Sequence, residues 1–395
     1  MSICENFGGE IFPVIMAVIF DKIYRKHTLL AGLPIKRIFI TFVSEIMAKN
    51  NKNNTTTRNN PLKWTYAGGA LIALLIVMSI ALWQFSSVGY RGETSWVHIP
   101  AGATSEAVGD SLRNALGNDF GPRVYRLWRW MDGKPAIAHG AYRIDRSTAA
   151  WKVARTLKNG AQTPVKLTFN NIRTLPDLAS RLSSKMEWSA EDFINACDTI
   201  LPKHGFTPPQ FTAAFLPDTY EFYWNTPANK VVTKLLGYRN DYWDSDRRAI
   251  ARGIGLSPVE VATIASIVEE ETLKADERPK VARLYINRLE RGMKLQADPT
   301  VKFAVGDFSL RRIKGTHLAV KSPYNTYLNY GLPPGPIRIA GKDAIEAVLS
   351  APHHNYIYMC AKEDFSGYHN FAVDYATHRA NARRYHEMLN QRKIN

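Results

Sequence analysis

The stretch SPVEVATIASIVEEET, from Ser257 to Thr272, constrains the chain most, because it ends an otherwise apolar helix with three consecutive carboxylates. Ser257 can cap this helix, Pro258 suits its first position, and Glu260 completes an S-x-x-E capping box. The sequence therefore predicts a helix with a well-marked start and a charged end, and we expect the rest of the chain to be organised around it.

One face of this helix points to chemistry. At 100° per residue, Glu271 falls on the same stripe as Ile264 and Ile267, so we expect it to face inward. Lost hydration raises the pKa of such a carboxyl, and a protonated Glu in an apolar wall is what a general acid requires. A buried structural ion pair would also place a Glu there. Glu269 and Glu270 project to the flanks, where a solvated charge cluster is expected.

Length and composition exclude a disordered chain. The 395 residues suffice for two or three domains, and 45% hydrophobic with 11% aromatic residues indicates packed cores. A net charge of +16 suggests an anionic partner, which could be nucleic acid, a membrane leaflet or an acidic polymer. Cys4, Cys197 and Cys360 are odd in number and far apart, so neither a disulfide framework nor a metal knuckle is expected.

A charge-free run between Lys63 and Arg91 predicts a transmembrane helix over residues 64–86, with Tyr66 to Trp83 as its apolar body. The basic residues before it place the N-terminus in the cytoplasm. A cleaved signal peptide is the alternative, but the apolar core exceeds the usual length and no A-x-A site follows. We therefore expect a single-pass protein of the plasma (inner) membrane with an extracytoplasmic C-terminal part, which disfavours nucleic acid as the partner.

The segment before this run has the composition of a flexible tail. From Met47 the sequence MAKNNKNNTTTRNNPLK is polar, rich in Asn and free of acidic residues, so residues 1–63 are expected to form a cytoplasmic tail. Met47 opens this tail so cleanly that we expect it to be the true initiator, with residues 1–46 outside the native protein.

Three strand–helix units with the same internal spacing follow the predicted membrane helix. The first apolar residue and the closing Leu of each unit are Val97 and Leu112, Tyr142 and Leu157, and Leu167 and Leu182. A threonine that can cap stands near the start of each helix: Thr104, Thr148 and Thr174.

The remainder of the chain mixes helices with short strands, which gives an α+β fold class. A strand or extended loop is expected within Phe215 to Thr226, displaying Asp218 and Glu221. Further helices are expected at residues 278–291, 342–349 and 374–390, and a hairpin is expected around residues 356–372. Between them the proline-stiffened loop SPYNTYLNYGLPPGPI presents Tyr324, Asn325, Tyr327 and Asn329, which suit hydrogen bonding and stacking against sugars.

The motifs ASIVEEET, INRLERGMKLQADPT, SPYNTYLNYGLPPGPI and GYHNF, with FLPDTYEFY upstream, resemble those of the MltG (YceG-like) endolytic murein transglycosylases. The resemblance runs from about Val97 to the C-terminus. It implies a membrane helix, a LysM-like strand–helix domain over residues 95–165 and an α+β catalytic domain over residues 166–395. The second Glu of the family's E-x-E-T motif, its catalytic acid, corresponds to Glu271. Glu270 departs from the family, because relatives often have Lys there, and the N-terminal extension departs as well.

This resemblance implies a membrane-anchored endolytic lytic transglycosylase that cuts the bond between N-acetylmuramic acid (MurNAc) and N-acetylglucosamine (GlcNAc) in nascent strands, leaving 1,6-anhydro-MurNAc ends. It needs no cofactor and no metal. Expected partners are peptidoglycan glycan strands, the membrane, and peptidoglycan synthases or divisome proteins, with no nucleic acid. The candidates for binding the sugar or holding Glu271 are Asp218, Gln296, Asp298, Thr300, Tyr324 and Asn325.

Three alternatives remain at this point. A muramidase would use a second carboxylate, for which Asp218 and Asp298 are the first candidates. A membrane-anchored wall-binding protein would not need Glu271, which would then be packed solid rather than lie in a cleft. A metal-dependent hydrolase is disfavoured, because no H-E-x-x-H or comparable ligand spacing joins its potential ligands. These potential ligands are His353, His354, His369 and His378.

Overall fold

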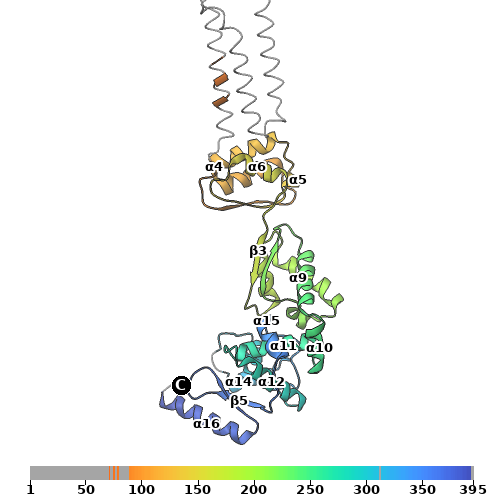
Figure 1. The fold of residues 1–395 in the computed structure, drawn as a ribbon, viewed down its shortest axis with the longest axis vertical. Helices are drawn as coiled ribbons and strands as arrows, with labels where there is room; N and C mark the ends of the chain where they lie inside the picture. The colour runs from red at the N-terminus through yellow and green to blue at the C-terminus, as the bar shows by residue number, and fades with distance from the viewer. Residues whose placement is uncertain (1–70, 72–73, 76–77, 80–88, 311–312, 393–395) are drawn as a thin grey trace, which may run out of the picture. The chain divides into compact units, whose positions relative to one another are not determined.

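The computed structural model has an α+β fold (Figure 1) and describes residues 71, 74–75, 78–79, 89–310 and 313–392. Its contacts divide the chain into two units, Met1–Ser79 and Ile80–Asn395. The predicted tail and nearly all of the predicted membrane helix lie outside the described residues. Among the described residues no single helix is long and apolar enough to cross a membrane, and α10 (Ser245–Gly253) with α11 (Pro258–Glu271) pass that test only together, across a bend of 76°.

The first core of the larger unit is built from the first two predicted strand–helix units. Strands β1 (Ser95–Ile99) and β2 (Gly140–Ile144) pair antiparallel, with Val97 opposite Tyr142. Helices α4 (Ser105–Trp130) and α6 (Ala150–Lys158) pack on one another, and α4 also packs on β1 (Figure 1). A short helix, α5, spans Pro135–Ala138. Both predicted units are therefore confirmed.

Two of the three predicted threonine caps are confirmed. Thr104 accepts a hydrogen bond from the backbone N–H of Ala107, and Thr174 forms a capping box with Asp177. Thr148 does not cap, because α6 begins one residue later and has Ala149 at its N-cap. The backbone carbonyl of Thr148 instead accepts a hydrogen bond from the N–H of Tyr90, 2.9 Å away.

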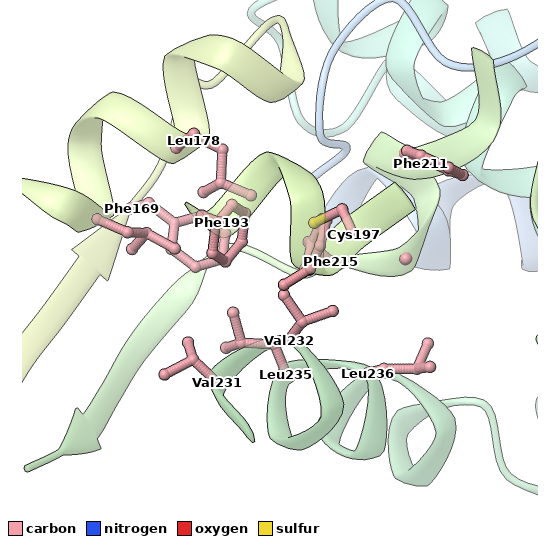
Figure 2. Close-up of a cluster of buried hydrophobic side chains, with 14 of the residues drawn as sticks. Phe169, Leu178, Phe193, Cys197, Phe211, Phe215, Val231, Val232, Leu235 and Leu236 are labelled. Atoms are coloured by element: carbon pink, nitrogen blue, oxygen red, sulfur yellow. The ribbon is translucent and has the colours of Figure 1, made fainter. Parts of the chain in front are cut away.

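The third predicted unit belongs to a different core. Strand β3 (Val165–Phe169) pairs antiparallel with β4 (Asp218–Phe222), which confirms the strand expected in that segment, and α7 (Leu175–Ser183) follows β3. Helices α8 (Ala190–Ile200) and α9 (Ala228–Tyr242) complete this core. Figure 2 shows side chains of α9 directed at the aromatic residues of the same cluster.

The last core surrounds α11, in which every residue from Val261 to Val268 is buried. The helix is therefore covered all round rather than along one stripe, because α12 (Arg278–Glu290), α13 (Asp298–Val305) and α15 (Lys342–Leu349) all pack against it. The predicted hairpin is confirmed as β5 (Tyr358–Ala361) paired with β6 (His369–Ala372), and α16 (Tyr375–Gln391) packs on both strands. The remaining short helices are η2 (Leu201–His204), η3 (Pro208–Ala214) and α14 (Gly315–Leu318).

The first core begins earlier than the boundary predicted at residue 95. The Tyr90 side chain is buried in that core, with its ring 5.4 Å from that of Phe120. Its backbone exchanges hydrogen bonds with Ser147 and Thr148. Tyr90 therefore ties the incoming chain to the turn that precedes α6.

This tie predicts a difference between two truncated proteins. A fragment that starts at Gly89 should be more stable than one that starts at Thr94 by about 1.5 kcal/mol, because the shorter fragment loses the buried Tyr90 ring. Urea unfolding followed by circular dichroism measures the difference. Equal midpoints for the two fragments would show that Tyr90 does not belong to the folded core.

Candidate active site

The catalytic candidate lies where α11 ends. The predicted capping box is confirmed at its start, since the Ser257 N–H donates to Glu260 at 2.7 Å and the Glu260 N–H donates to the Ser257 hydroxyl at 3.3 Å. At its other end Thr272 turns into extended backbone with φ of −137°. The carbonyl end of a helix disfavours negative charge, so a carboxyl at this position gains a further reason to stay protonated.

Glu271 is partly exposed and is held by a tyrosine. The Tyr285 hydroxyl donates a hydrogen bond to Glu271 Oε1 at 2.7 Å. Burial of the carboxyl raises the pKa of Glu271 to about 7, although the Tyr285 hydrogen bond lowers it. Asp298 raises the same pKa through charge, while His369 and Lys302 lower it. With this pKa, the protonated and the ionised forms of Glu271 are both populated near neutral pH. A group that first gives and then takes a proton needs access to both forms.

The two preceding glutamates are not the solvated pair expected from the sequence. The Glu269 and Glu270 side chains are each only 15% exposed, because they face buried Arg338 and the neighbouring loops. Glu270 accepts from Arg338 at 2.7 Å and also pairs with Arg173 at 3.0 Å. Glu269 accepts from the Gly341 N–H at 3.0 Å. These two arginines offset the negative charge that Glu270 places beside the candidate acid.

A second wall of the site comes from α12 and the loop after it. Arg288 donates to Gln296 Oε1 and, at 2.9 Å each, to the carbonyls of Lys294 and Ile357. Gln296 has a positive φ of 53°, a conformation that costs energy for residues other than glycine. The loop that carries exposed Gln296 is therefore held in one shape by a buried arginine.

Asp298 is a carboxylate whose charge acts on Glu271. It opens α13, remains exposed, and accepts a hydrogen bond from the Tyr327 hydroxyl at 2.6 Å. Burial raises the pKa of Tyr327, and the charges of Asp298 and Glu271 raise it further, so this hydroxyl stays a donor. The proline-stiffened loop thus contributes Tyr327 to the site.

The β5–β6 hairpin contributes a fixed imidazole. His369 Nδ1 lies 2.8 Å from buried Glu277, which also accepts the His369 backbone N–H at 2.8 Å. A carboxylate on Nδ1 places the ring proton there, so that Nε2 is the acceptor in the neutral form. In the described ranges Nε2 has no hydrogen-bond partner. The charge effect of His369 on Glu271 indicates that this ring lies near the candidate acid.

The family model described as "YceG-like family" matches residues 97–384, which is most of the chain. The chain belongs to the YceG-like family.

Relatives from two bacteria share one name. The proteins named "Endolytic murein transglycosylase" from Bacillus subtilis and Streptococcus pneumoniae are 27% and 24% identical over 295 and 297 residues. These matches cover 68% and 67% of this chain, 79% of the Bacillus protein and only 54% of the pneumococcal one. A crystal structure of a YceG-like protein from Listeria monocytogenes is 23% identical with a TM-score of 0.49, covering 73% of this chain and 98% of that one.

Two of the predicted sugar-binding residues lie inside the scaffold of this YceG-like chain. Thr300 is fully buried, donating to the Ala297 carbonyl at 2.7 Å and sharing a hydrogen bond with the Thr326 hydroxyl. The buried Asn325 side chain donates to the carbonyls of Leu318 and Val320 and accepts from the Tyr327 N–H. Both residues shape the loops beside the site and offer no free polar atom to a substrate.

The other two predicted residues take different positions. Tyr324 is half-buried, with its ring 4.6 Å from that of Phe303, and its hydroxyl lies 3.4 Å from the Pro209 carbonyl. Asp218 is bound by Lys342 at 2.6 Å in a separate groove beside β4, and no described contact joins it to Glu271. Of the six predicted residues, Asp298 acts on Glu271 through its charge, and Gln296 is held by Arg288 of α12.

The histidines proposed as metal ligands do not converge. His369 is paired with Glu277, and His378 stacks on Tyr358 with centroids 5.2 Å apart. Within the described ranges no three His, Cys, Asp or Glu side chains are grouped closely enough to hold a metal ion.

The sequence did not single out Tyr285 or Glu277, and it placed Tyr327 in the proline-stiffened loop without assigning it to the site. Tyr285 stands between two apolar residues of α12, Leu284 and Ile286, so its position in the sequence suggested that it packs in the core. Tyr327 stood in the quoted loop, but its alternation with Asn residues did not reveal which side chains face inward. Glu277 is recognisable as a site residue only because it contacts His369 of the GYHNF segment, which is distant in the sequence and close only in the folded chain.

The raised pKa of Glu271 predicts a pH-dependent gain in stability when it is replaced. Between its ordinary value of 4.5 and about 7 the folded chain holds a proton that the unfolded chain has lost, so the wild-type protein loses stability as pH rises through 7. Glu271→Gln cannot ionise and keeps an acceptor for Tyr285. Its stability relative to wild type should rise by roughly 2 kcal/mol between about pH 5 and about pH 8.

Thermal unfolding at the two pH values measures this change, with Glu221→Gln, an exposed residue of β4, as the control. A constant difference between Glu271→Gln and wild type at both pH values would mean that the carboxyl titrates normally.

Proposed function

We propose that this chain is an endolytic murein transglycosylase that cuts peptidoglycan strands between MurNAc and GlcNAc and leaves 1,6-anhydro-MurNAc ends. One observation carries the proposal: Glu271, the residue that matches the family's acid, is a partly exposed carboxyl with a pKa of about 7 and a tyrosine donor at 2.7 Å. The names of the relatives support the reaction class. A partly exposed carboxyl also disfavours the alternative of a non-catalytic wall-binding protein, for which Glu271 was expected to be packed solid.

One carboxyl group suffices for the reaction. Protonated Glu271 donates its proton to the glycosidic oxygen, the C1–O bond breaks, and GlcNAc leaves as the alcohol. The positive charge on C1 is quenched by the 6-hydroxyl oxygen of the same muramoyl ring. Glu271, now a carboxylate, takes the hydroxyl proton and is regenerated. No water enters the product, and the pKa near 7 suits both halves of the cycle.

The neighbours of Glu271 have separable roles in this scheme. Tyr285 fixes the carboxyl and stabilises its ionised form after the first proton transfer. Asp298 raises the pKa of Glu271 and, as an exposed carboxylate, can stabilise the positive charge that develops on C1. His369, oriented by Glu277, offers Nε2 to a hydroxyl or N-acetyl group of the substrate.

Asp298 also favours a second candidate function. In a muramidase a second carboxylate activates water or attacks C1 directly. Asp298 is exposed and acts electrostatically on Glu271, so it could serve in that role. The transglycosylase is preferred because the Tyr327 hydroxyl already occupies Asp298 Oδ1 at 2.6 Å, an oxygen that a muramidase would need to direct at water or C1.

The cellular setting is also a proposal. We infer a plasma-membrane protein anchored by one helix at residues 64–86, with a cytoplasmic tail at 1–63, a LysM-like wall-binding module at 95–165 and an extracytoplasmic catalytic domain at 166–395. The antiparallel β1–β2 pair with helices between its strands supports the module. The charge-free run supports the anchor. Peptidoglycan synthases and divisome proteins are the expected partners at such a location.

The role of Glu271 is tested by isosteric replacement. Glu271→Gln should lower the cleavage of purified peptidoglycan strands by roughly 10²–10⁴-fold, because the amide can neither give nor take the proton. Release of soluble fragments, followed by chromatography, measures the rate. The fold should persist, since glutamine still accepts from Tyr285.

Glu269→Gln is the matched control on the same helix turn. Glutamine at 269 can still accept from the Gly341 N–H, so activity should stay within a fewfold of wild type while stability falls slightly through the weaker Arg338 pair. Equal losses in the two variants would remove the special role assigned to Glu271.

Tyr285→Phe should shift the pH profile. The protonated form of Glu271 starts the reaction, so kcat/KM should fall as pH rises past the pKa near 7. Removing the Tyr285 hydrogen bond, which lowers that pKa, should move this alkaline limb to higher pH and lower kcat by about tenfold. Tyr356→Phe, whose hydroxyl makes no hydrogen bond within the described ranges, is the control. An unmoved limb in Tyr285→Phe would separate Tyr285 from the acid.

A further inference from the structure

We propose that a basic, tyrosine-lined groove between β4 and α9 binds an anionic stretch of the glycan strand as a subsite apart from Glu271, an inference that rests on the proposed function. The groove has a volume of about 790 Å³ and does not include the catalytic candidate. Its walls combine Tyr223 and Tyr238 with Lys230, Lys234 and Lys342.

Helix α9 is amphipathic, and its polar side forms one wall of this groove. Val231, Val232, Leu235 and Leu236 face the buried cluster, where Figure 2 shows them beneath Phe215 and Cys197. The groove side carries Lys230, Lys234, Tyr238 and Tyr242 at four-residue spacing. Because residues four apart lie on one side of a helix, these side chains form a continuous ridge.

The positive charge of the ridge is not neutralised by the protein. Asp218 is taken by Lys342 at 2.6 Å, and Glu221 lies 3.8 Å from Lys166. In the part of the chain that the structure describes, no carboxylate lies within ion-pair distance of Lys230 or Lys234. Two lysines beside one another without counter-charges favour an anionic ligand.

The tyrosines add surfaces for rings. Tyr223 is 51% exposed and Tyr238 is 40% exposed, so both rings are accessible to a ligand. The Lys234 ammonium lies 4.9 Å from the centre of the Phe222 ring and 5.7 Å from that of Tyr238. Lys234 is therefore held along the groove wall, beside faces on which the C–H side of a sugar ring can stack.

The tyrosine rings and lysines of the groove suit a ligand in which rings and carboxylates alternate. A peptidoglycan strand presents sugar rings whose muramoyl units carry lactyl and peptide carboxylates, so that stacking surfaces and anions recur along its length. A second cavity of about 690 Å³ on the other side of the ridge also includes Lys230 and Lys234, with Asn195, Thr199 and Thr233 on its walls. The ridge is thus open on both sides, as the binding of an extended polymer requires.

The groove is connected to the catalytic helix α11 through the backbone beside Lys342. Lys342, which closes the groove, directly follows Gly341, whose N–H donates to Glu269 of α11 at 3.0 Å. An enzyme that cuts inside a strand has no chain end to hold, so it needs contacts with sugars away from the broken bond. The groove supplies such contacts on a scaffold tied to Glu269.

The test compares long and short substrates in the full-length protein. The double substitution Lys230→Gln with Lys234→Gln should raise KM for long uncrosslinked strands by roughly tenfold and leave cleavage of a tetrasaccharide unchanged. Lys185→Gln with Arg252→Gln removes the same charge from exposed residues outside both cavities and should change neither value. An unchanged KM for long strands in the first variant would overturn the subsite.

Binding is measured separately so that it does not depend on catalysis. In the Glu271→Gln background, fluorescence anisotropy with labelled long strands should give a Kd about tenfold weaker after the two lysine substitutions. Strands with carbodiimide-blocked carboxylates should bind the Glu271→Gln parent as weakly as that variant binds intact strands. Equal affinity of the parent for blocked and intact strands would overturn the anionic ligand. A chain that binds as expected but cleaves nothing would refute the proposed function and leave the groove intact.

Discussion

The active site depends on the hydrogen bond from the Tyr285 hydroxyl to the Glu271 carboxyl. It joins the end of α11 to the middle of α12, two helices that are otherwise held by buried aliphatic side chains. Burial alone favours the protonated form of Glu271, and full exposure would favour its ionised form. The opposing effects of burial and of the tyrosine donor bring its pKa to about 7, where one group can serve as acid and then as base.

The surrounding charges are arranged to protect this balance. Glu269 and Glu270 would repel an ionised Glu271 if they were left unpaired, but Arg338 and Arg173 engage them. The arginines come from segments far apart in the chain, so the last turn of α11 also fastens the β3–α7 connection and the loop before α15. Buried ion pairs contribute little net stability, and their value here lies in fixing the position of the helix end.

Local features of the sequence were predictable because they depend on near neighbours. The capping box at Ser257, the two caps at Thr104 and Thr174, and the hairpin of β5 and β6 follow from residues close together in the chain. The burial of Glu269 and Glu270 could not be predicted, since their arginine partners come from distant segments. The inward position of Thr300 and Asn325 was unpredictable for a related reason: a polar residue in a loop can satisfy backbone carbonyls inside it as readily as it can meet a substrate.

The identity of the new chain end reports whether water or the muramoyl 6-hydroxyl attacks C1, and so distinguishes a muramidase from a transglycosylase. Long strands would be digested by the wild-type protein in H₂¹⁸O and the fragments analysed by mass spectrometry. Intramolecular attack predicts anhydro ends that lack one water relative to a reducing end and carry no ¹⁸O. Reducing ends that incorporate ¹⁸O would contradict the transglycosylase and make Asp298 the second carboxylate of a muramidase.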